Sequence, residues 1–287
     1  MTQPMRMLLV GALLLTQAEL HDPAFAQTPL SCRGGASPMN GAAFADCARV
    51  AAEKYQDRNK AIRDGYRQIG RDFPAMGEHW IKVPLVFDGV VDPTRPEVLN
   101  YVLVEGKPKL VGLGFAAPLL AGELAPESPA GRDAWHDHSR TIEDETVLPH
   151  TDSAHTGHGA ARGPRLAMLH TWLWALNPAG VFAQDNWGLS YVRLGLAVPA
   201  GAPLEAAKAL SLLTGGVDYF SELFAAEPRA VSRDTAKTRA ALAVARSKVE
   251  PIVRERSGPG LSASDLSALA GIWEDLLRAI DGATIRQ

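Results

Sequence analysis

The sequence predicts an α+β fold, in which a mainly antiparallel sheet packs with an N-terminal helix and is followed by a helical C-terminal region. Three observations lead to this class. Apolar residues recur with a helical period in residues 45–71, alternate with the period of a strand in segments between 81 and 198, and return to a helical period after residue 203. Strands that follow one another, rather than alternating with helices, are typical of antiparallel sheets.

Residues 45–71 are the predicted N-terminal helix. Asp46 is the expected N-cap, since an aspartate oxygen accepts hydrogen bonds from the first helical N–H groups. Phe73-Pro74 ends the segment, because proline disfavours a helical conformation in the residue before it. The apolar stripe comprises Ala48, Ala51, Ala52, Tyr55 and Ile62.

Short segments with apolar residues at alternate positions are the predicted strands. Residues 105–108, with the sequence Glu-Gly-Lys-Pro, are typical of a hairpin turn between two of them. Gly112-Leu113-Gly114 indicates a bulge or a close backbone approach within the strand after this turn. The predicted strands are residues 81–87, 98–104, 109–115, 166–176 and 189–198.

The C-terminal region is expected to contain three helices that pack on the core. Gly215-Gly216 interrupts the first, and Pro251 kinks or ends the second. Ser262 and Asp265 form a capping box at the start of the third. The predicted helices are residues 204–224, 232–256 and 262–280.

The N-terminus has the pattern of a secretory signal peptide rather than of a disordered apolar tail. Arg6 precedes an apolar run of ten residues, and Ala24-Phe25-Ala26 fits the small-x-small cleavage rule. The run is too short to span a bilayer, which needs about 20 residues. We therefore expect residues 1–26 to be removed near Ala26-Gln27, leaving a periplasmic or secreted protein without stable membrane insertion. The mature chain then divides into a core domain, 27–200, and a helical region, 201–287.

Export gives the two cysteines a specific meaning. Cys32 and Cys47 both lie in the mature chain, and in an oxidising compartment two such cysteines normally form a disulfide. The bond would tie the N-terminal arm to the first helix. The spacing differs from the CxxC pattern of metal and redox sites, so a disulfide is the favoured interpretation.

Charge is distributed unevenly along the chain. The net charge of −3 over 287 residues gives no basic stripe, so nucleic acid is not an expected partner. Residues 121–161 contain eight acidic residues against two arginines. The surrounding segment, 118–165, shows no regular period, and loops of this length are usually functional or disordered.

Histidines are concentrated in the same part of the chain. Six of the eight lie between residues 136 and 170. Imidazole is a common ligand of copper and zinc, and a His-x-His pair plus a distant histidine on a rigid strand is a plausible ligand set. The predicted metal ligands are His79, His136, His138 and His170, with Glu78, Glu143, Glu145, His150, His155 and His158 as further ligands or as hydrogen-bond partners of the ligands.

Each of these residues also has a simpler interpretation. His150, His155 and His158 lie among Gly, Ser and Thr, as in a solvated loop or a weak metal-capturing tract. His170 and His79 are alternatively core residues packed beside tryptophans. Tryptophans near the histidines are either ordinary core residues or the wall of a small-ligand pocket, and the pocket candidates are Trp172, Trp174 and Trp187. No GxSxG, P-loop or GxGxxG motif is present.

Three motifs resemble those of a family of secreted bacterial proteins that has no assigned activity. They are M-G-x-H-[WY], D-P-x-x-P-E-x-L-x-Y and L-H-x-W-x-W-x-x-N-P-x-G-x-F, here beginning at Met76, Asp92 and Leu169. The resemblance covers roughly residues 45–190, and this chain departs from it by the acidic His-rich insertion and the helical tail. It implies that His79 and His170, both at motif positions, belong to one site.

These observations leave three functional hypotheses. The first is an exported metalloprotein whose histidine site holds a catalytic metal at an open site, with copper as the first choice and zinc as the second. The second is a non-catalytic protein that captures or delivers a metal through residues 136–158. The third is a small-ligand binding module without metal, in which the tryptophans line the pocket.

Overall fold

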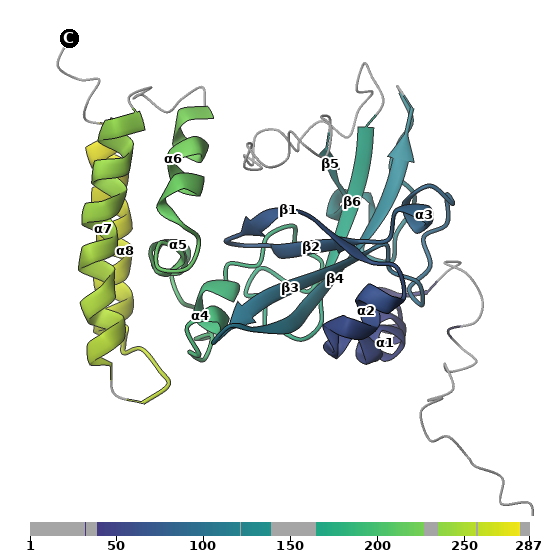
Figure 1. Cartoon of the computed structure of the whole chain (residues 1–287), viewed down its shortest axis with the longest axis horizontal. Helices are drawn as coiled ribbons and strands as arrows, with labels where there is room; N and C mark the ends of the chain where they lie inside the picture. The colour runs from purple at the N-terminus through teal and green to yellow at the C-terminus, as the bar shows by residue number, and fades with distance from the viewer. Residues whose placement is uncertain are drawn as a thin grey trace, which may run out of the picture.

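The predicted α+β class is confirmed by a computed structural model of the chain. It describes residues 32, 39–120, 122–138, 165–226, 235–256 and 258–281. A six-stranded antiparallel sheet has the order β1-β2-β3-β4-β6-β5. The N-terminal helices lie beside this sheet, and the C-terminal helices stand at its other end (Figure 1).

The N-terminal helix is shorter than predicted and begins earlier. It consists of α1 (Gly41–Ala52), a 3-10 turn (Glu53–Gln56) and α2 (Arg58–Arg63). The N-cap is Asn40, whose side chain accepts a hydrogen bond from the Ala43 amide at 2.9 Å, so the prediction of Asp46 as the cap is wrong. The helix does not reach residue 71, because Gly65 at φ +97° turns the chain into a strand.

The first two strands lie earlier in the chain than the strand predicted at residues 81–87. The strands are β1 (Arg67–Phe73) and β2 (Gly77–Ile81), whereas most of the predicted strand 81–87 is a short helix, α3 (Val83–Val86). Pro84 lies in the first turn of α3, where its fixed φ and missing N–H are tolerated. The alternating apolar residues of 81–87 therefore predict a strand where the chain mostly forms a helix.

The second hairpin agrees with the prediction. Strands β3 (Val98–Val104) and β4 (Lys107–Leu119) are joined by Glu105 and Gly106, both with positive φ, as a tight hairpin turn requires. Strand β6 (Arg165–Trp172) pairs with β4, and the short β5 (His136–His138) pairs with the outer side of β6. A further 3-10 turn spans Arg132–Ala134.

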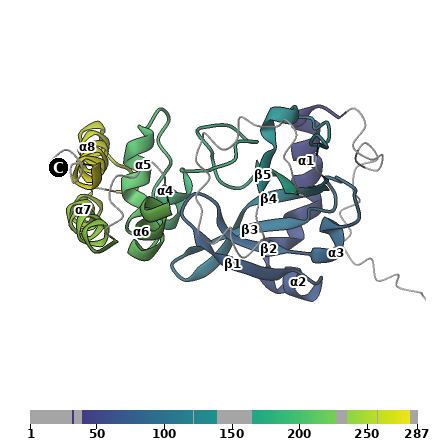
Figure 2. The ribbon, with the colours of Figure 1, turned by 90° about the horizontal axis from the view of Figure 1, so that it is seen from above.

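The two faces of the sheet have different coverings. On one face, α1 packs through Phe44 against Phe115 of β4, with ring centroids 4.9 Å apart. Figure 2 shows α1 lying against the sheet. Trp80, Leu99, Tyr101 and Leu169 complete this core. The opposite face carries separate apolar groups around Phe73, Val102 and Trp172 and around Val98, Ala116 and Met168. We call this second face the inner face.

The C-terminal part is helical, as expected from residue 204 onward. Its elements are α4 (Leu189–Arg193), α5 (Leu204–Ser211), α6 (Val217–Ala226), α7 (Thr235–Glu255) and α8 (Ala263–Asp281). The predicted strand 189–198 is wrong, because its first half is α4; the Asn186 side chain accepts from the Gly188 amide at 2.9 Å just before this helix. The Ser262–Asp265 capping box is confirmed by reciprocal hydrogen bonds. No helix in the described ranges is long and apolar enough to cross a membrane.

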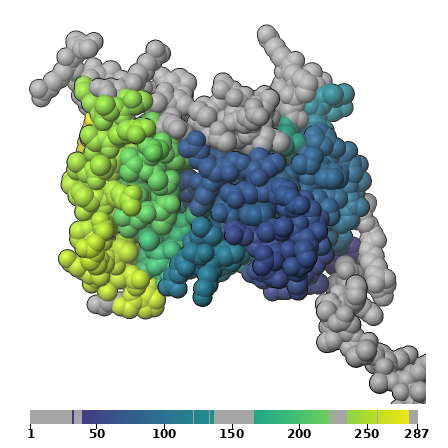
Figure 3. Space-filling model, viewed as in Figure 1, coloured from purple at the N-terminus to yellow at the C-terminus, as the bar shows by residue number. Residues whose placement is uncertain are grey.

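The helices contact the sheet at the end of β1. Arg193 of α4 forms a two-pronged ion pair with Asp72 and donates to the Phe73 carbonyl oxygen at 3.0 Å. The Phe73 ring also meets Tyr219 of α6, with centroids 5.8 Å apart. The helical and sheet parts are accordingly in direct contact in the space-filling view (Figure 3).

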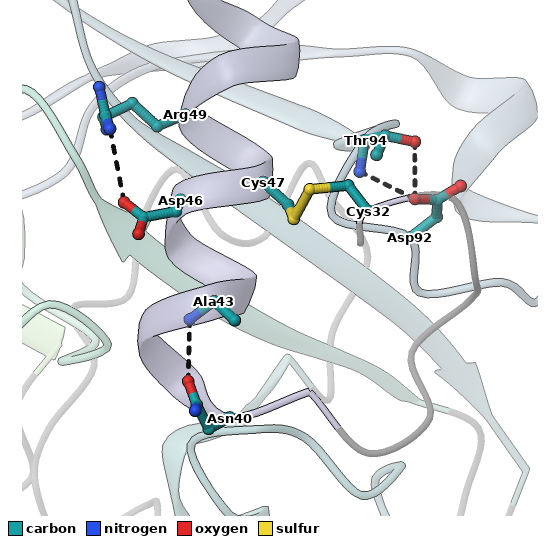
Figure 4. Close-up of a disulfide and its surroundings, with 8 residues drawn as sticks. All are labelled: Cys32, Asn40, Ala43, Asp46, Cys47, Arg49, Asp92 and Thr94. Atoms are coloured by element: carbon teal, nitrogen blue, oxygen red, sulfur yellow. Dashed lines mark hydrogen bonds and ion pairs between the residues drawn. A yellow bond between two sulfur atoms is a disulfide. The ribbon is translucent and has the colours of Figure 1, made fainter. Parts of the chain in front are cut away.

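The predicted disulfide between Cys32 and Cys47 is formed. Its Cα atoms are 5.6 Å apart, and both residues are buried. The bond fixes residue 32 to the middle of α1, close to the turn that contains Asp92 and Thr94 (Figure 4). The N-terminal arm is thereby joined covalently to the helix that covers the sheet.

Removal of this disulfide should lower stability by about 3 kcal/mol, because the bond closes a loop with a sequence separation of 15 residues in the unfolded chain. We expect the Cys32→Ser/Cys47→Ser double variant to unfold at lower urea concentration than the wild type. Adding reductant should lower the midpoint of the wild type and leave that of the double variant unchanged. An equal effect of reductant on both proteins would contradict this role.

Glu97 is expected to make the free energy of unfolding depend on pH. It is 1% exposed, and its Oε2 atom has no hydrogen-bond partner among the described residues. Burial raises the pKa of this carboxyl to about 9, from an ordinary value of 4.5. Between these two values the unfolded state releases the proton and the folded state retains it, so stability falls as pH rises.

We therefore expect Glu97 to lower the free energy of unfolding by about 1.4 kcal/mol per pH unit between pH 4.5 and 9. Glu97→Gln should remove this slope, because the amide stays neutral. Urea unfolding at pH 5 and pH 8 would measure it, with Glu255→Gln, an exposed site on α7, as the control that keeps the slope. Parallel pH profiles of wild type and Glu97→Gln would refute the assignment.

Candidate functional site

Three of the predicted metal ligands lie together on the inner face. His79 is on β2, His136 on β5 and His170 on β6. The ring centroids of His136 and His170 are 4.9 Å apart, and those of His79 and His170 are 5.8 Å apart. Because a ligand nitrogen lies about 2 Å from its metal, both separations are within the span of two imidazoles on one ion. We call these three residues the histidine cluster.

The cluster depends on a bend in the sheet. Two strands, β3 and β4, lie between β2 and β6, so in a flat sheet His79 and His170 would sit on strands about 14 Å apart. A close approach of their rings requires the inner face to be concave. Irregular pairing interrupts the β1–β2 and β3–β4 ladders, and such irregularities bend a sheet.

Glycines on β4 make room for side chains of both neighbouring strands, β3 and β6. Gly112 pairs with Trp172 and Gly114 with His170. A Cβ atom on Gly112 would lie 2.7 Å from the Trp172 ring, and one on Gly114 would lie 2.9 Å from Val98 Cβ. The close backbone approach predicted for Gly112-Leu113-Gly114 is thus confirmed, and it lies directly beside the histidine cluster.

His170 is held in a defined orientation. Its Nδ1 atom is 2.7 Å from the Gln184 carbonyl oxygen, which only accepts hydrogen bonds, so Nδ1 carries the proton. In the neutral imidazole the lone pair is then on Nε2, the usual arrangement of a histidine that binds a metal. The Trp172 ring lies edge-on to His170 at 5.4 Å and donates from Nε1 to the Ala183 carbonyl oxygen at 2.6 Å. The 183–184 backbone therefore fixes both rings.

His79 is half-buried and is backed by an aromatic side chain. The Phe73 ring lies edge-on to His79 at 5.6 Å, and Tyr219 contacts the far side of this group from α6. Burial, assisted by the negative charge of Asp185, raises the pKa of Tyr219 above its usual range, so its hydroxyl stays protonated. Tyr219 of the helical region therefore contacts Phe73, and Phe73 in turn contacts His79 of the cluster.

Glu78 lies apart from the cluster. It precedes His79 on β2, so its side chain points to the opposite face of the sheet. There its carboxylate accepts from Arg58 at 3.0 Å and from Trp80 Nε1 at 2.9 Å. These bonds account for the buried charge of Glu78 without a metal.

The three pocket tryptophans fall into different environments. Trp172 borders the histidine cluster, whereas Trp174 packs against the α1 side of the sheet and donates to Glu53 at 3.0 Å. Trp187 packs with the helical region, and the Lys208 ammonium lies 5.4 Å from its ring. Only Trp172 is therefore positioned to contact a ligand at the cluster.

The remaining predicted ligands lie outside what the structure describes. His138 belongs to β5 and its backbone pairs with Leu166, but its side chain is not among those described. Glu143, Glu145, His150, His155 and His158 all lie in the undescribed stretch 139–164. Among the described side chains, no group of three or more His, Cys, Asp or Glu is arranged to hold a metal ion. The histidine cluster is therefore not a complete ligand set by itself.

Several residues at the cluster carried no signal in the sequence. Phe73 and Tyr219 resemble ordinary core aromatics, and Asn100 resembles a polar residue within a strand. Asn100 pairs with His79 across β2 and β3, is 0% exposed, and donates from Nδ2 to the Met76 carbonyl oxygen at 3.2 Å. The only signal in the sequence is an asparagine among the apolar residues of a predicted strand, where its amide would be buried.

Comparisons of the chain with protein-family models, with curated proteins and with solved structures found no match. The functional argument accordingly rests on the histidine cluster and its surroundings.

Gly112→Ala tests the packing beside the cluster. The new methyl group would overlap the Trp172 ring, so we expect the free energy of unfolding to fall by about 1–3 kcal/mol. Gly271→Ala is the matched control, because its position in α8 has open space and alanine favours a helix by about 0.5–1 kcal/mol. Urea unfolding measures both. A Gly112→Ala protein as stable as the wild type would show that β4 and β6 separate easily.

Proposed function

We propose that the protein is an exported metal-binding protein whose site is built on His79, His136 and His170, with His138 as a fourth ligand. The observation that carries the proposal is the meeting of three imidazoles from three separate strands on one concave face. Imidazole nitrogens are preferred ligands of copper and zinc, which we propose as the first and second choice of metal.

The surroundings of the cluster support a metal site over a set of core histidines. The proton on His170 Nδ1 directs the Nε2 lone pair away from Gln184, as in a metal-bound imidazole. His138 follows two residues after His136 on β5, so one short strand supplies two candidate ligands. Bound copper would supply one-electron chemistry, and bound zinc would activate a water molecule.

Binding requires a small rearrangement of the described side chains. Because they do not form a complete ligand set, the His79 and His136 rings would turn about their side-chain bonds toward the His170 ring, which stays fixed, and His138 would complete the coordination. Imidazole rings rotate without moving the strands that carry them. The role of the sheet is therefore to hold the three Cα positions, while the metal selects the orientations of the His79 and His136 rings.

Export is the second part of the proposal. Residues 1–26 have the signal-peptide pattern, and the Cys32–Cys47 disulfide is the kind of bond that forms in an oxidising compartment. Two of the three clustered histidines, His79 and His170, also lie in motifs that resemble those of secreted bacterial proteins. We propose a periplasmic or secreted location on these grounds.

Metal content is the decisive test. We expect protein purified without an affinity tag and incubated with Cu²⁺ or Zn²⁺ to retain one metal per chain after desalting. His170→Ala should weaken binding at least tenfold, because it removes a central ligand, while a triple His150→Ala/His155→Ala/His158→Ala variant should retain the stoichiometry. Circular dichroism would confirm that each variant is folded.

Other outcomes point to other functions. Metal retained in His170→Ala but lost in the triple variant would favour capture through the 136–158 segment over a site on the sheet. No bound metal in the wild type would overturn the proposal and leave the small-ligand hypothesis, with Trp172 at the binding surface.

A further inference from the structure

Exposed apolar side chains gather where β2 ends. Phe87, at the end of α3, is 72% exposed, more than any other large apolar side chain in the described ranges. Val83, four residues earlier, is 46% exposed, whereas Val86 is buried in an apolar group with Val98 of β3. Ile62 of α2 is 38% exposed. The helix α3 therefore packs on the sheet with one side and presents apolar side chains to water with the other.

Backbone pairing brings α2 and α3 next to each other. Arg67, at the start of β1, pairs with Ile81, at the end of β2. The chain enters Arg67 from α2 and leaves Ile81 toward α3. A Cβ atom on Gly65 would lie 3.9 Å from Lys82 Cε, so the two connections are in contact. Figure 1 and Figure 2 both show α2 and α3 as neighbours at this end of the sheet.

Basic side chains lie among these apolar ones. Arg63 at the end of α2 and Arg67 are exposed, and Lys82, which is half-buried, lies directly before α3. Arg67 Nη1 donates to two carbonyl oxygens at the end of α2, at 2.8 and 2.7 Å, so its guanidinium is held in place at the surface. We define the α2–α3 patch as Ile62, Arg63, Arg67, Lys82, Val83 and Phe87.

The patch keeps a positive charge because the acidic residues around it are engaged. Asp64 accepts from a lysine and a tyrosine before α2, at 2.9 and 2.8 Å, and Asp88 pairs with Arg95. Asp57 is a distant partner of Arg63, at 3.9 Å. The other two basic residues of the patch form no ion pair within the described ranges. The sign is opposite to the net charge of the chain, which is −3.

We propose that the α2–α3 patch attaches the protein reversibly to a membrane surface that contains anionic lipids. The arginines and the lysine would contact the headgroup phosphates, while Phe87, Val83 and Ile62 enter the boundary between headgroups and acyl chains. Attachment of this kind lies in the plane of the interface and needs no helix that crosses the bilayer. It is a separate property from metal binding, since no residue of the histidine cluster belongs to the patch.

A lipid surface fits the patch better than a second copy of the chain. Two copies of a positively charged patch would repel each other. A stable protein interface also needs about 1,000 Å² of complementary surface, whereas a bilayer accepts a few projecting side chains without a matching cavity. An acidic protein surface shares the charge complementarity and is the alternative that the experiment must separate from lipid.

Vesicle flotation of the full mature chain tests the proposal. The vesicles are phosphatidylcholine alone or phosphatidylcholine with about 40% phosphatidylglycerol, in about 0.05 M NaCl, where surface charges are weakly screened. We expect the wild type to float with the anionic vesicles and to stay in solution with the neutral ones. Raising NaCl to about 0.5 M should weaken the binding by about tenfold or more, because salt screens the attraction.

Two variants separate the charged and apolar contributions. Arg63→Gln/Arg67→Gln/Lys82→Gln should weaken binding to the anionic vesicles by about 100-fold, since each basic residue near such a surface contributes about a factor of five. Phe87→Ser keeps the charge and should weaken binding by about tenfold, because it removes the largest inserted side chain.

The matched controls change the same chemistry elsewhere on the surface. Lys107→Gln/Lys109→Gln/Lys248→Gln removes the same charge from three exposed positions outside the patch. Val244→Ser removes an apolar side chain that is 55% exposed on α7. Both controls should bind like the wild type, and circular dichroism would confirm that every variant is folded.

The outcomes decide between the possible partners. Binding that is lost in the two patch variants and kept in the two controls would support attachment to lipid. No binding of the wild type to anionic vesicles, or equal losses in patch and control variants, would overturn it. Retention of the wild type on immobilised polyglutamate without flotation would also overturn it, in favour of an acidic protein partner.

Discussion

The tight packing of β4 against β6 at Gly112, and against Val98 of β3 at Gly114, is the constraint on which the inner face depends. Without side chains at these two positions, the Trp172 ring packs against Gly112, and Val98 and His170 pack beside Gly114. Larger residues would push the strands or rings apart, and β2 would no longer bring His79 close to His170. The histidine cluster is thus a property of sheet shape, and the metal-binding potential of the face follows from the two residues without a Cβ atom on one strand, β4.

Some parts of the fold are predictable from the sequence because they depend on interactions between residues only a few positions apart. The Glu105-Gly106 turn, the Ser262–Asp265 capping box and the break at Gly215-Gly216 all depend on neighbouring backbone atoms, so the sequence pattern was sufficient. Residues 81–87 and 189–198 were misassigned because a short apolar run fits a strand and a helix equally well. There the outcome was decided by Pro84 in a first helical turn and by the Asn186 side chain, which bonds to the Gly188 amide.

For the candidate site too, features of the sequence identified some residues, whereas residues brought close only by the tertiary fold were missed. Histidine spacing and the resemblance were enough to associate His79 with His170, and the clustering in sequence added His136. Asn100 and Tyr219 were missed because their proximity depends on strand order and on helix docking. The order β4-β6-β5 inverts the sequence order of the last two strands, and no periodic pattern encodes such an inversion.

The contacts of Arg193 with Asp72 and Phe73 couple the unfolding of the helices to that of the sheet. The guanidinium is nearly buried and holds the end of β1 by a charged pair and a main-chain oxygen, while Tyr219 closes on the same phenylalanine. A chain stopped at residue 200 would keep the arginine but lose the tyrosine, so one side of Phe73 would meet water. Sheet and helices are therefore expected to melt in a single calorimetric transition, and occupancy at the histidines to raise the melting temperature of both.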